Sequence, residues 1–187
     1  MRSKVKVLCG SLCAVVVGIA AAVAVPAFSE ATKSGAKAIG PELATIQWNR
    51  LDAAVQTAGK TGKPVFVTVY TDWCGYCKLM ERTTFTDPGV VNALRANWIP
   101  ARLNGESRAS LKLGKQTLTE GEWAMGNGVE GFPATFLLDS KGNPFSLIPG
   151  YIEAPQMAMF LKEAQAYLKA GGPGKAGDFN DWLAKHP

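Results

Sequence analysis

This chain of 187 residues has few of the side chains that form metal sites or that cross-link small folds by disulfide bonds. It contains one histidine and four cysteines. His186 is next to the C-terminal residue, and Cys9 and Cys13 fall in an apolar N-terminal stretch. A structural zinc site takes about four nitrogen or sulfur ligands. The two cysteines that remain, Cys74 and Cys77, cannot fill such a site, so we expect no metal.

Basic charge is also scarce once the N-terminal stretch is set aside. Three basic residues precede an apolar run from Val7 to Val25, followed by small residues, which is typical of a secretory signal peptide. We predict cleavage after Ala27; the alternatives are cleavage after Ala24 and retention as a membrane anchor. Removing residues 1–27 takes away three basic and no acidic residues and lowers the formal charge from +5 to +2.

The remaining 160 residues have no dense Lys/Arg cluster and no aromatic motif of an RNA-binding sheet, so we expect no nucleic-acid partner. Their number suits one domain with a hydrophobic core. We predict a flexible arm at 28–44, a domain at 45–170 and a C-terminal tail at 171–187. A domain of this size needs no disulfide bond to stabilise its fold, so two cysteines at CxxC spacing are better explained as a reactive pair.

The run Trp73-Cys74-Gly75-Tyr76-Cys77 follows an apolar segment, Val65 to Tyr70, and opens a segment that favours helix. At a helix N-terminus, the dipole and unpaired backbone N–H groups stabilise a thiolate. We therefore predict that Cys74 is the nucleophile and the more exposed cysteine, and that Cys77 resolves the mixed disulfide. On spacing alone, a structural disulfide and half of a zinc site are the alternatives.

The pattern of apolar and turn residues predicts alternating strands and helices. The first half contains a strand at 46–48, a helix capped by Asn49 and ended by residues 59–64, a buried strand at 65–70, a helix from Cys77, a helix at 90–97 and a strand at 98–103. The second half contains an inserted loop or short helix at 104–119, a helix at 120–127, a hairpin of strands 135–139 and 145–148, a helix at 154–169 and a short docked helix in the tail. This order is typical of an α/β fold with a central mixed sheet and helices on both faces.

The element order, the WCGYC sequence and the sequence GFPAT at 131–135 resemble the thioredoxin superfamily over residues 48–168. Within it, residues 71–78 and 84–88 look most like the C-terminal periplasmic domain of the transmembrane reductase DsbD and its stand-alone relatives. The resemblance implies a thioredoxin-like fold and a thiol:disulfide oxidoreductase whose only cofactor is its own redox-active disulfide, Cys74–Cys77.

The resemblance also implies roles for residues around the pair. Pro133 matches the cis-proline of the superfamily, and Phe132 before it would contact a partner polypeptide; its alternative role is core packing. Trp73 would pack and shield the disulfide. The spacer, Gly75 and Tyr76, sets the stability of the thiolate and through it the reduction potential.

Proton handling is where this chain departs from the superfamily pattern. Many thioredoxins have a buried acid six residues before the first cysteine, and here that position is Thr68. Glu81, four residues after Cys77, matches a glutamate of the DsbD domain and would accept a proton from the resolving thiol. A solvated surface glutamate is the alternative.

These implications combine into a functional expectation. The protein would be exported and exchange electrons with protein disulfides in the periplasm, as a monomeric reductase or electron carrier supplied by a membrane donor of the DsbD type. One alternative is an oxidase or isomerase with the same site. Another is a non-catalytic binding protein that uses the groove beside Pro133.

Overall fold

The computed structural model describes residues 45–186. The predicted signal peptide at 1–27 and arm at 28–44 lie outside the described residues.

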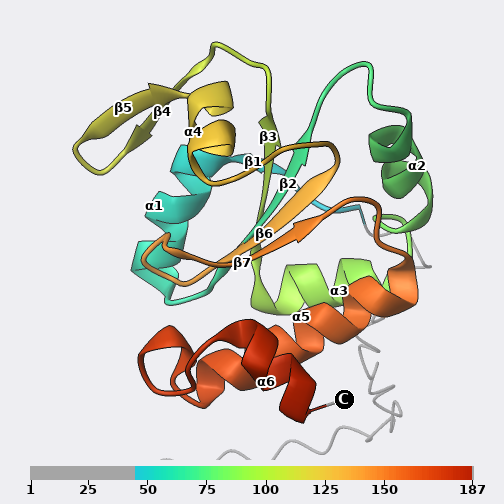
Figure 1. The fold of residues 1–187 in the computed structure, drawn as a ribbon, viewed down its shortest axis with the longest axis vertical. Helices are drawn as coiled ribbons and strands as arrows, with labels where there is room; N and C mark the ends of the chain where they lie inside the picture. The colour runs from blue at the N-terminus through green and yellow to red at the C-terminus, as the bar shows by residue number, and fades with distance from the viewer. Residues whose placement is uncertain (1–44, 187) are drawn as a thin grey trace, which may run out of the picture. The chain divides into compact units, whose positions relative to one another are not determined.

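A five-stranded mixed sheet forms the centre of the domain (Figure 1). Its strands lie in the order β1 (Asn49–Arg50), β3 (Ile99–Asn104), β2 (Val65–Tyr70), β6 (Ala134–Leu138) and β7 (Pro144–Pro149). The first three are mutually parallel, whereas β6 and β7 each run antiparallel to the preceding strand in this order. β2 is therefore the middle strand, and its first five residues are buried, as predicted.

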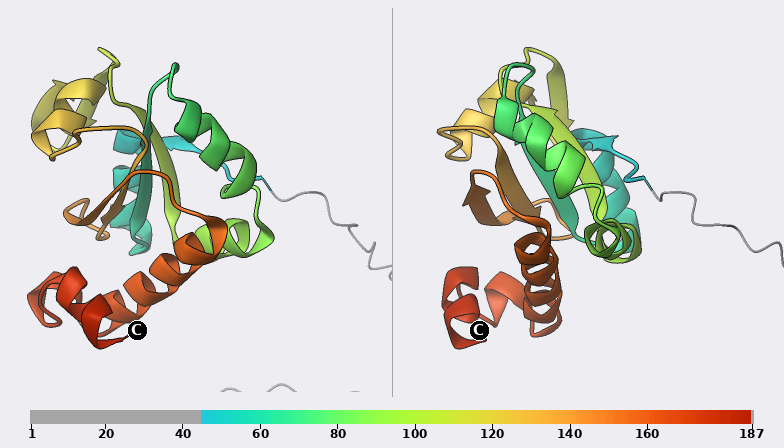
Figure 2. Two further views of the ribbon diagram at one scale, coloured as in Figure 1. Left: turned by 45° about the vertical axis from the view of Figure 1, so that its right-hand side comes forward. Right: turned by 90° about the vertical axis from the view of Figure 1, so that its right-hand side faces the viewer.

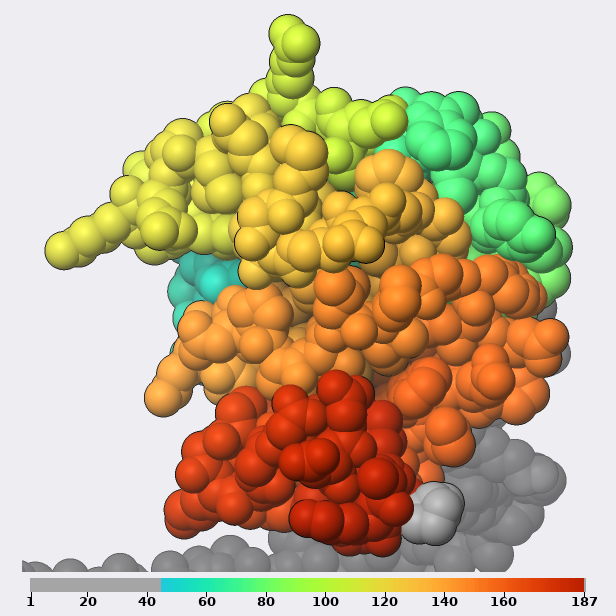
Figure 3. All heavy atoms as spheres, viewed as in Figure 1, coloured from blue at the N-terminus to red at the C-terminus, as the bar shows by residue number. Residues whose placement is uncertain are grey.

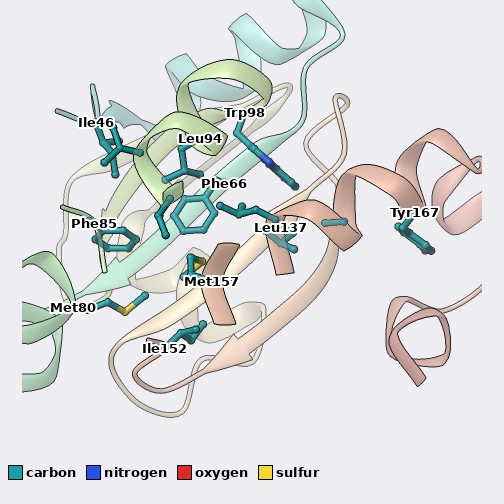
Figure 4. Close-up of a cluster of buried hydrophobic side chains, with 14 of the residues drawn as sticks. Ile46, Phe66, Met80, Phe85, Leu94, Trp98, Leu137, Ile152, Met157 and Tyr167 are labelled. Atoms are coloured by element: carbon teal, nitrogen blue, oxygen red, sulfur yellow. The ribbon is translucent and has the colours of Figure 1, made fainter. Parts of the chain in front are cut away.

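Helices cover both faces of the sheet, which confirms the predicted architecture. They are α1 (Leu51–Thr61), α2 (Gly75–Thr83), α3 (Pro88–Asn97), α4 (Glu120–Gly126), α5 (Ala154–Lys169), the short 3-10 helix η1 (Gly172–Gly174) and α6 (Phe179–Lys185). Because side chains alternate along β2, Phe66 joins a core with α3 and α5, which Figure 4 shows, while Val65, Val67 and Val69 join a core with α1 and α4.

The first strand and helix differ from prediction. The strand is Asn49–Arg50 rather than 46–48, and it pairs in parallel with Ala101 and Arg102. Asn49 does not cap α1, because its side-chain amide donates a hydrogen bond to the carbonyl of Pro100 at 2.9 Å. Pairing with a distant strand has overridden the local capping signal. The helix also runs through Gly59 and ends at Thr61, with Gly62 as its C-cap in the left-handed region at a φ of 73°.

Most of the segment 104–119, predicted as an inserted loop or short helix, is a hairpin, and only residues 105–109 are a loop. After β3 the chain makes a hairpin of β4 (Ser110–Leu113) and β5 (Gln116–Thr119), with Gly114 in the left-handed region at the turn. Leu111 is fully buried in the α1 and α4 core, while the hairpin projects from the surface in Figure 3. Strands this short are stabilised by each other and by that contact, so the local pattern could not reveal them.

Helix α5 and the C-terminal tail follow the prediction. α5 has the predicted bounds; its buried residues are Met157, Leu161, Ala164 and Tyr167, and Met159 is exposed. The tail folds back beside α5 in both views of Figure 2, and buried Phe179 of α6 packs 5.1 Å from the ring of Tyr167. The predicted docking of the tail is confirmed.

A capping box at the start of α4 supplies a test of local stability. The Thr119 hydroxyl accepts from the Glu122 N–H, and the Glu122 carboxylate accepts from the Thr119 N–H at 2.7 Å. We expect Thr119→Ala to lower the free energy of unfolding by about 1 kcal/mol in urea titrations, because an N-cap is lost. Thr117→Ala, on the exposed part of the same strand, is the control; equal losses in the two variants would contradict a capping role.

The same box makes stability depend on pH. Hydrogen bonds from the Thr119 backbone and side chain lower the pKa of Glu122 below its usual value. The stabilisation is therefore complete above the unfolded-state pKa of a glutamate and is lost as pH falls through the lowered value. Glu122→Gln keeps an acceptor oxygen at every pH, so the acid limb of its stability curve should be flatter than in the wild type.

Candidate active site

The two cysteines lie where the central strand passes into α2. The Cys74 N–H donates to the Thr71 carbonyl at 3.2 Å in the turn after β2. Cys74 is the N-cap of α2, and its Sγ accepts a hydrogen bond from the Cys77 N–H at 3.0 Å. The sulfur therefore occupies the position where free N–H groups and the helix dipole favour negative charge. Cys74 and Cys77 are joined by a disulfide.

The prediction that Cys74 is the more exposed cysteine is wrong for this oxidised state. Cys74 is 3% exposed and Cys77 is 5% exposed. The two disulfide-bonded residues are buried to nearly the same extent, so exposure does not separate them. What distinguishes Cys74 is its place at the helix N-terminus and the hydrogen bond to its sulfur.

The loop before β6 holds the predicted proline and phenylalanine. The Phe132–Pro133 peptide bond is cis, as the resemblance implied, and the Pro133 carbonyl accepts from the Gly150 N–H at 2.8 Å. Phe132 is half-buried: it packs against the α1 and α4 core and lies edge-on to the indole of Trp73, with ring centroids 6.1 Å apart. Its ring therefore contributes to packing and also reaches the surface beside the pair.

Aromatic side chains of the CxxC segment face solvent. Trp73 and Tyr76 are 67% and 66% exposed. The indole Nε1 of Trp73 donates to a Glu106 carboxylate oxygen at 2.9 Å, and the ring of Tyr76 lies 6.4 Å from that of Tyr151. The other spacer residue, Gly75, has open space where a side chain would be.

Glu81 is not a free surface glutamate, because its carboxylate pairs with the guanidinium of Arg102 on β3. The same guanidinium lies over the Tyr70 ring, 4.4 Å from its centroid, in a cation–π contact. Arg102 had no predicted role. It is the one charged residue in the otherwise uncharged run 99–103 of a predicted strand, and that was the signal available.

Thr68, the position at which the resemblance leads one to expect a buried acid, belongs to a row of polar side chains that crosses the sheet. Thr68 is buried and pairs in register with Arg102 on one side and Thr135 on the other. Side chains that are in register on neighbouring strands lie on the same face of the sheet. Here that face also carries Phe66, and Met80 of α2 belongs to the hydrophobic core on it. The Thr135 hydroxyl is buried and has no hydrogen-bond partner among the described residues. Charge on this face thus comes from Arg102 and Glu81 rather than from position 68.

Metal-binding side chains do not gather elsewhere in the described part of the chain. Within residues 45–186, no group of three or more His, Cys, Asp and Glu side chains is placed to hold a metal ion.

A disulfide at the start of the helix after the central strand, together with a cis-proline before β6, defines a thioredoxin-like redox domain. The model of the thioredoxin-like domain family matches residues 51–165, and the chain belongs to that family.

Its curated relatives include thiol:disulfide interchange proteins DsbD. The protein of Cronobacter sakazakii is 34% identical over 114 residues, which are 59% of this chain and 18% of the relative. That of Ralstonia nicotianae is 31% identical over 121 residues, 64% of this chain and 17% of the relative. The predicted resemblance to DsbD is confirmed, although the chain spans less than a fifth of the length of these relatives.

Solved structures agree on the fold. A thioredoxin from Thermus thermophilus superposes with a TM-score of 0.58 at 21% identity, covering 70% of this chain and 95% of that one. A thioredoxin-fold protein from Helicobacter pylori gives 0.53 at 18% identity, covering 66% and 80%.

The packing of Phe132 on Gly105 can be tested by adding one methyl group. A Cβ at Gly105 would lie 2.3 Å from the Phe132 ring, so the ring or the loop must move. We expect Gly105→Ala to lower the free energy of unfolding by about 1–3 kcal/mol and to change Trp73 emission. Gly59→Ala in α1, where a Cβ meets nothing within 4 Å, should instead raise stability by about 0.5–1 kcal/mol. Wild-type stability and emission in Gly105→Ala would show that this contact constrains nothing.

Proposed function

We propose that this protein is an exported thiol:disulfide oxidoreductase that reduces protein disulfides in the periplasm, either as the final reductase or as an electron carrier. The observation that carries the proposal is the Cys74 sulfur at the N-cap of α2, where the Cys77 N–H donates to it. That environment favours a thiolate, which is the attacking species in thiol–disulfide exchange. Kinship with proteins named thiol:disulfide interchange protein supports the assignment.

The exchange proceeds in two displacements. The Cys74 thiolate attacks one sulfur of the substrate disulfide, forms a mixed disulfide and releases the other substrate sulfur as a thiolate. The Cys77 thiol loses its proton and attacks the Cys74 sulfur, which re-forms the Cys74–Cys77 disulfide and releases the second substrate thiolate. Two electrons have passed to the substrate, and a dithiol electron donor must reduce the pair before the next turnover.

Glu81 is the group that we assign to the proton of Cys77. The two residues are one turn apart on α2, and side chains four residues apart on a helix are neighbours. Arg102 of β3 pairs with the Glu81 carboxylate, and Thr68 places no competing acid on the adjacent sheet face. Glu81 therefore takes the role that a buried acid has in many thioredoxins.

The compartment and partners follow from the same reasoning. The signal pattern of residues 1–27 supports export, and a donor of the DsbD type would keep the pair reduced in an oxidising compartment. Among residues 45–186, no helix is both long enough and apolar enough to cross a membrane. Protein disulfides are the proposed substrates, and the protein is proposed to act as a monomer.

The direction of electron flow is tested by redox equilibrium with glutathione, followed through tryptophan emission. A reductase should have a potential of about −230 mV or lower. A value of about −180 to −120 mV would reassign the protein as an isomerase or oxidase.

Single cysteine variants test the order of attack. We expect Cys74→Ser to abolish turnover of protein disulfides, because the nucleophile is lost, and Cys77→Ser to accumulate a mixed disulfide through Cys74. The adduct is measured by non-reducing gels and mass spectrometry. Full function in Cys74→Ser would instead identify a binding protein with dispensable cysteines.

Replacing the carboxylate of Glu81 should slow the resolving step near neutral pH. In Glu81→Gln the proton of Cys77 must leave to solvent, and a free thiol with a pKa of about 8.5 does so readily only at higher pH. The rate of mixed-disulfide resolution should therefore differ from wild type near pH 7 and converge with it above about pH 9. Glu163→Gln on α5 is the matched control. Equal rates in Glu81→Gln and wild type over that range would remove Glu81 from the mechanism.

A further inference from the structure

A groove between α3 and α5 lies at the end of the sheet opposite to the candidate active site. Trp98, the residue just before β3, lines it. β3 runs parallel to β2, and the two cysteines follow the far, C-terminal end of β2. The groove has a volume of about 340 Å³, a size at which proteins bind small molecules. None of its lining residues belongs to the redox site.

One face of each helix forms the walls of this groove. The lining residues of α5 are spaced so that they share a face of the helix: Ala158, Leu161, Lys162, Gln165, Ala166 and Lys169. Those of α3 are Ala93 and Asn97, one turn apart. Ala93 and Ala158 pack on the core behind the groove, to which Leu161 belongs. The floor is therefore apolar, and its small side chains leave the space between the helices open.

The indole of Trp98 adds a polar group to this apolar floor. Trp98 is 2% exposed and belongs to the core between α3 and α5 that Figure 4 shows. Its Nε1–H is buried and has no hydrogen-bond acceptor among residues 45–186. The nearby Gln165 side chain is engaged elsewhere, since its amide donates to the Asn97 carbonyl at 3.3 Å. A buried donor without an acceptor is costly, and an acceptor brought by a ligand would remove that cost.

The charge around the groove has one sign. Lys162 and Lys169 line it and are exposed, and none of the lining residues is acidic. Within the described part of the chain, neither ammonium group forms an ion pair. A third ammonium, that of Lys63, donates to the Ala96 carbonyl at 2.9 Å near the end of α3. A ligand that complements these groups has an apolar body and an anionic acceptor.

We propose that the groove between α3 and α5 binds a free carboxylic acid with an alkyl chain, as its carboxylate. One carboxylate oxygen accepts the hydrogen bond from the Trp98 indole, and the ammonium groups of Lys162 and Lys169 balance the negative charge. The alkyl chain lies on the floor that includes Ala158 and Leu161. This binding goes beyond the proposed function and does not depend on it, because no reacting sulfur takes part.

The test titrates octanoate into the full chain in an isothermal calorimeter, with octanol and octylamine as comparison ligands. We expect saturable binding of one octanoate. Octanol should bind about ten- to a hundredfold more weakly, because it lacks the charge of the acceptor. Octylammonium should not bind, since it has no acceptor and is repelled by the two lysines. Absence of octanoate binding, or equal affinities for octanoate and octanol, would overturn the proposal.

Trp98→Phe tests the buried donor, because it keeps an aromatic ring and removes the N–H. The Kd for octanoate should rise about ten- to a hundredfold, the usual worth of a hydrogen bond to a charged group. Trp123→Phe, in the core of α1 and α4, is the matched control and should bind as the wild type does. An unchanged Kd in Trp98→Phe would show that the indole N–H is not directed at the ligand, and the assignment would be wrong.

Filling the groove tests its location. Ala158→Leu places a larger side chain on the floor and should abolish octanoate binding. Ala96→Leu, at an exposed position of α3 outside the lining, should leave it intact. If circular dichroism shows that Ala158→Leu does not fold, the double variant Lys162→Gln, Lys169→Gln takes its place; its affinity should be lower than that of the wild type, with the difference shrinking at high salt. Wild-type affinity in the folded filling variant or in the double variant would exclude this groove.

Discussion

Burial of the central strand β2 is the constraint on which the rest of the structure depends. Val65, Phe66, Val67 and Val69 are completely inaccessible, and each buried side chain of this size contributes about 1.5–3 kcal/mol. Hydrogen bonding to β3 on one side and β6 on the other holds the strand in place. The end of β2 therefore has a defined position, and the CxxC turn starts from it.

The candidate active site is assembled from the ends of these three neighbouring strands. β2 leads into the turn that carries Cys74, β3 leads into the loop that carries Glu106, and β6 begins just after Pro133. Residues more than fifty positions apart in the chain meet there because the strands are in register. The helix N-terminus then adds what the strands cannot, the Cys77 N–H that donates to the Cys74 sulfur and the positive end of the helix dipole.

Charge near the pair comes from α2 and β3 rather than from the central strand. The buried Thr68 on the central strand carries no charge, and the Glu81 carboxylate on α2 pairs with Arg102, which is in register with Thr68. A half-exposed ion pair costs less desolvation than a buried lone carboxylate. The start of α4 holds the loop after β3, and Glu106 in that loop accepts the hydrogen bond from Trp73.

The sequence by itself determined most of the elements and the two cysteines at the start of α2. Helices such as α5 and strands such as β2 are specified by local periodicity, and CxxC spacing with few other cysteines points to redox chemistry. Only the tertiary structure decided the register of β1, the hairpin at 110–119, the equal burial of the two cysteines and the partners of Glu81 and Trp73. Each of these depends on contacts between residues far apart in the chain, and local patterns carry no information about which distant side chain will be adjacent.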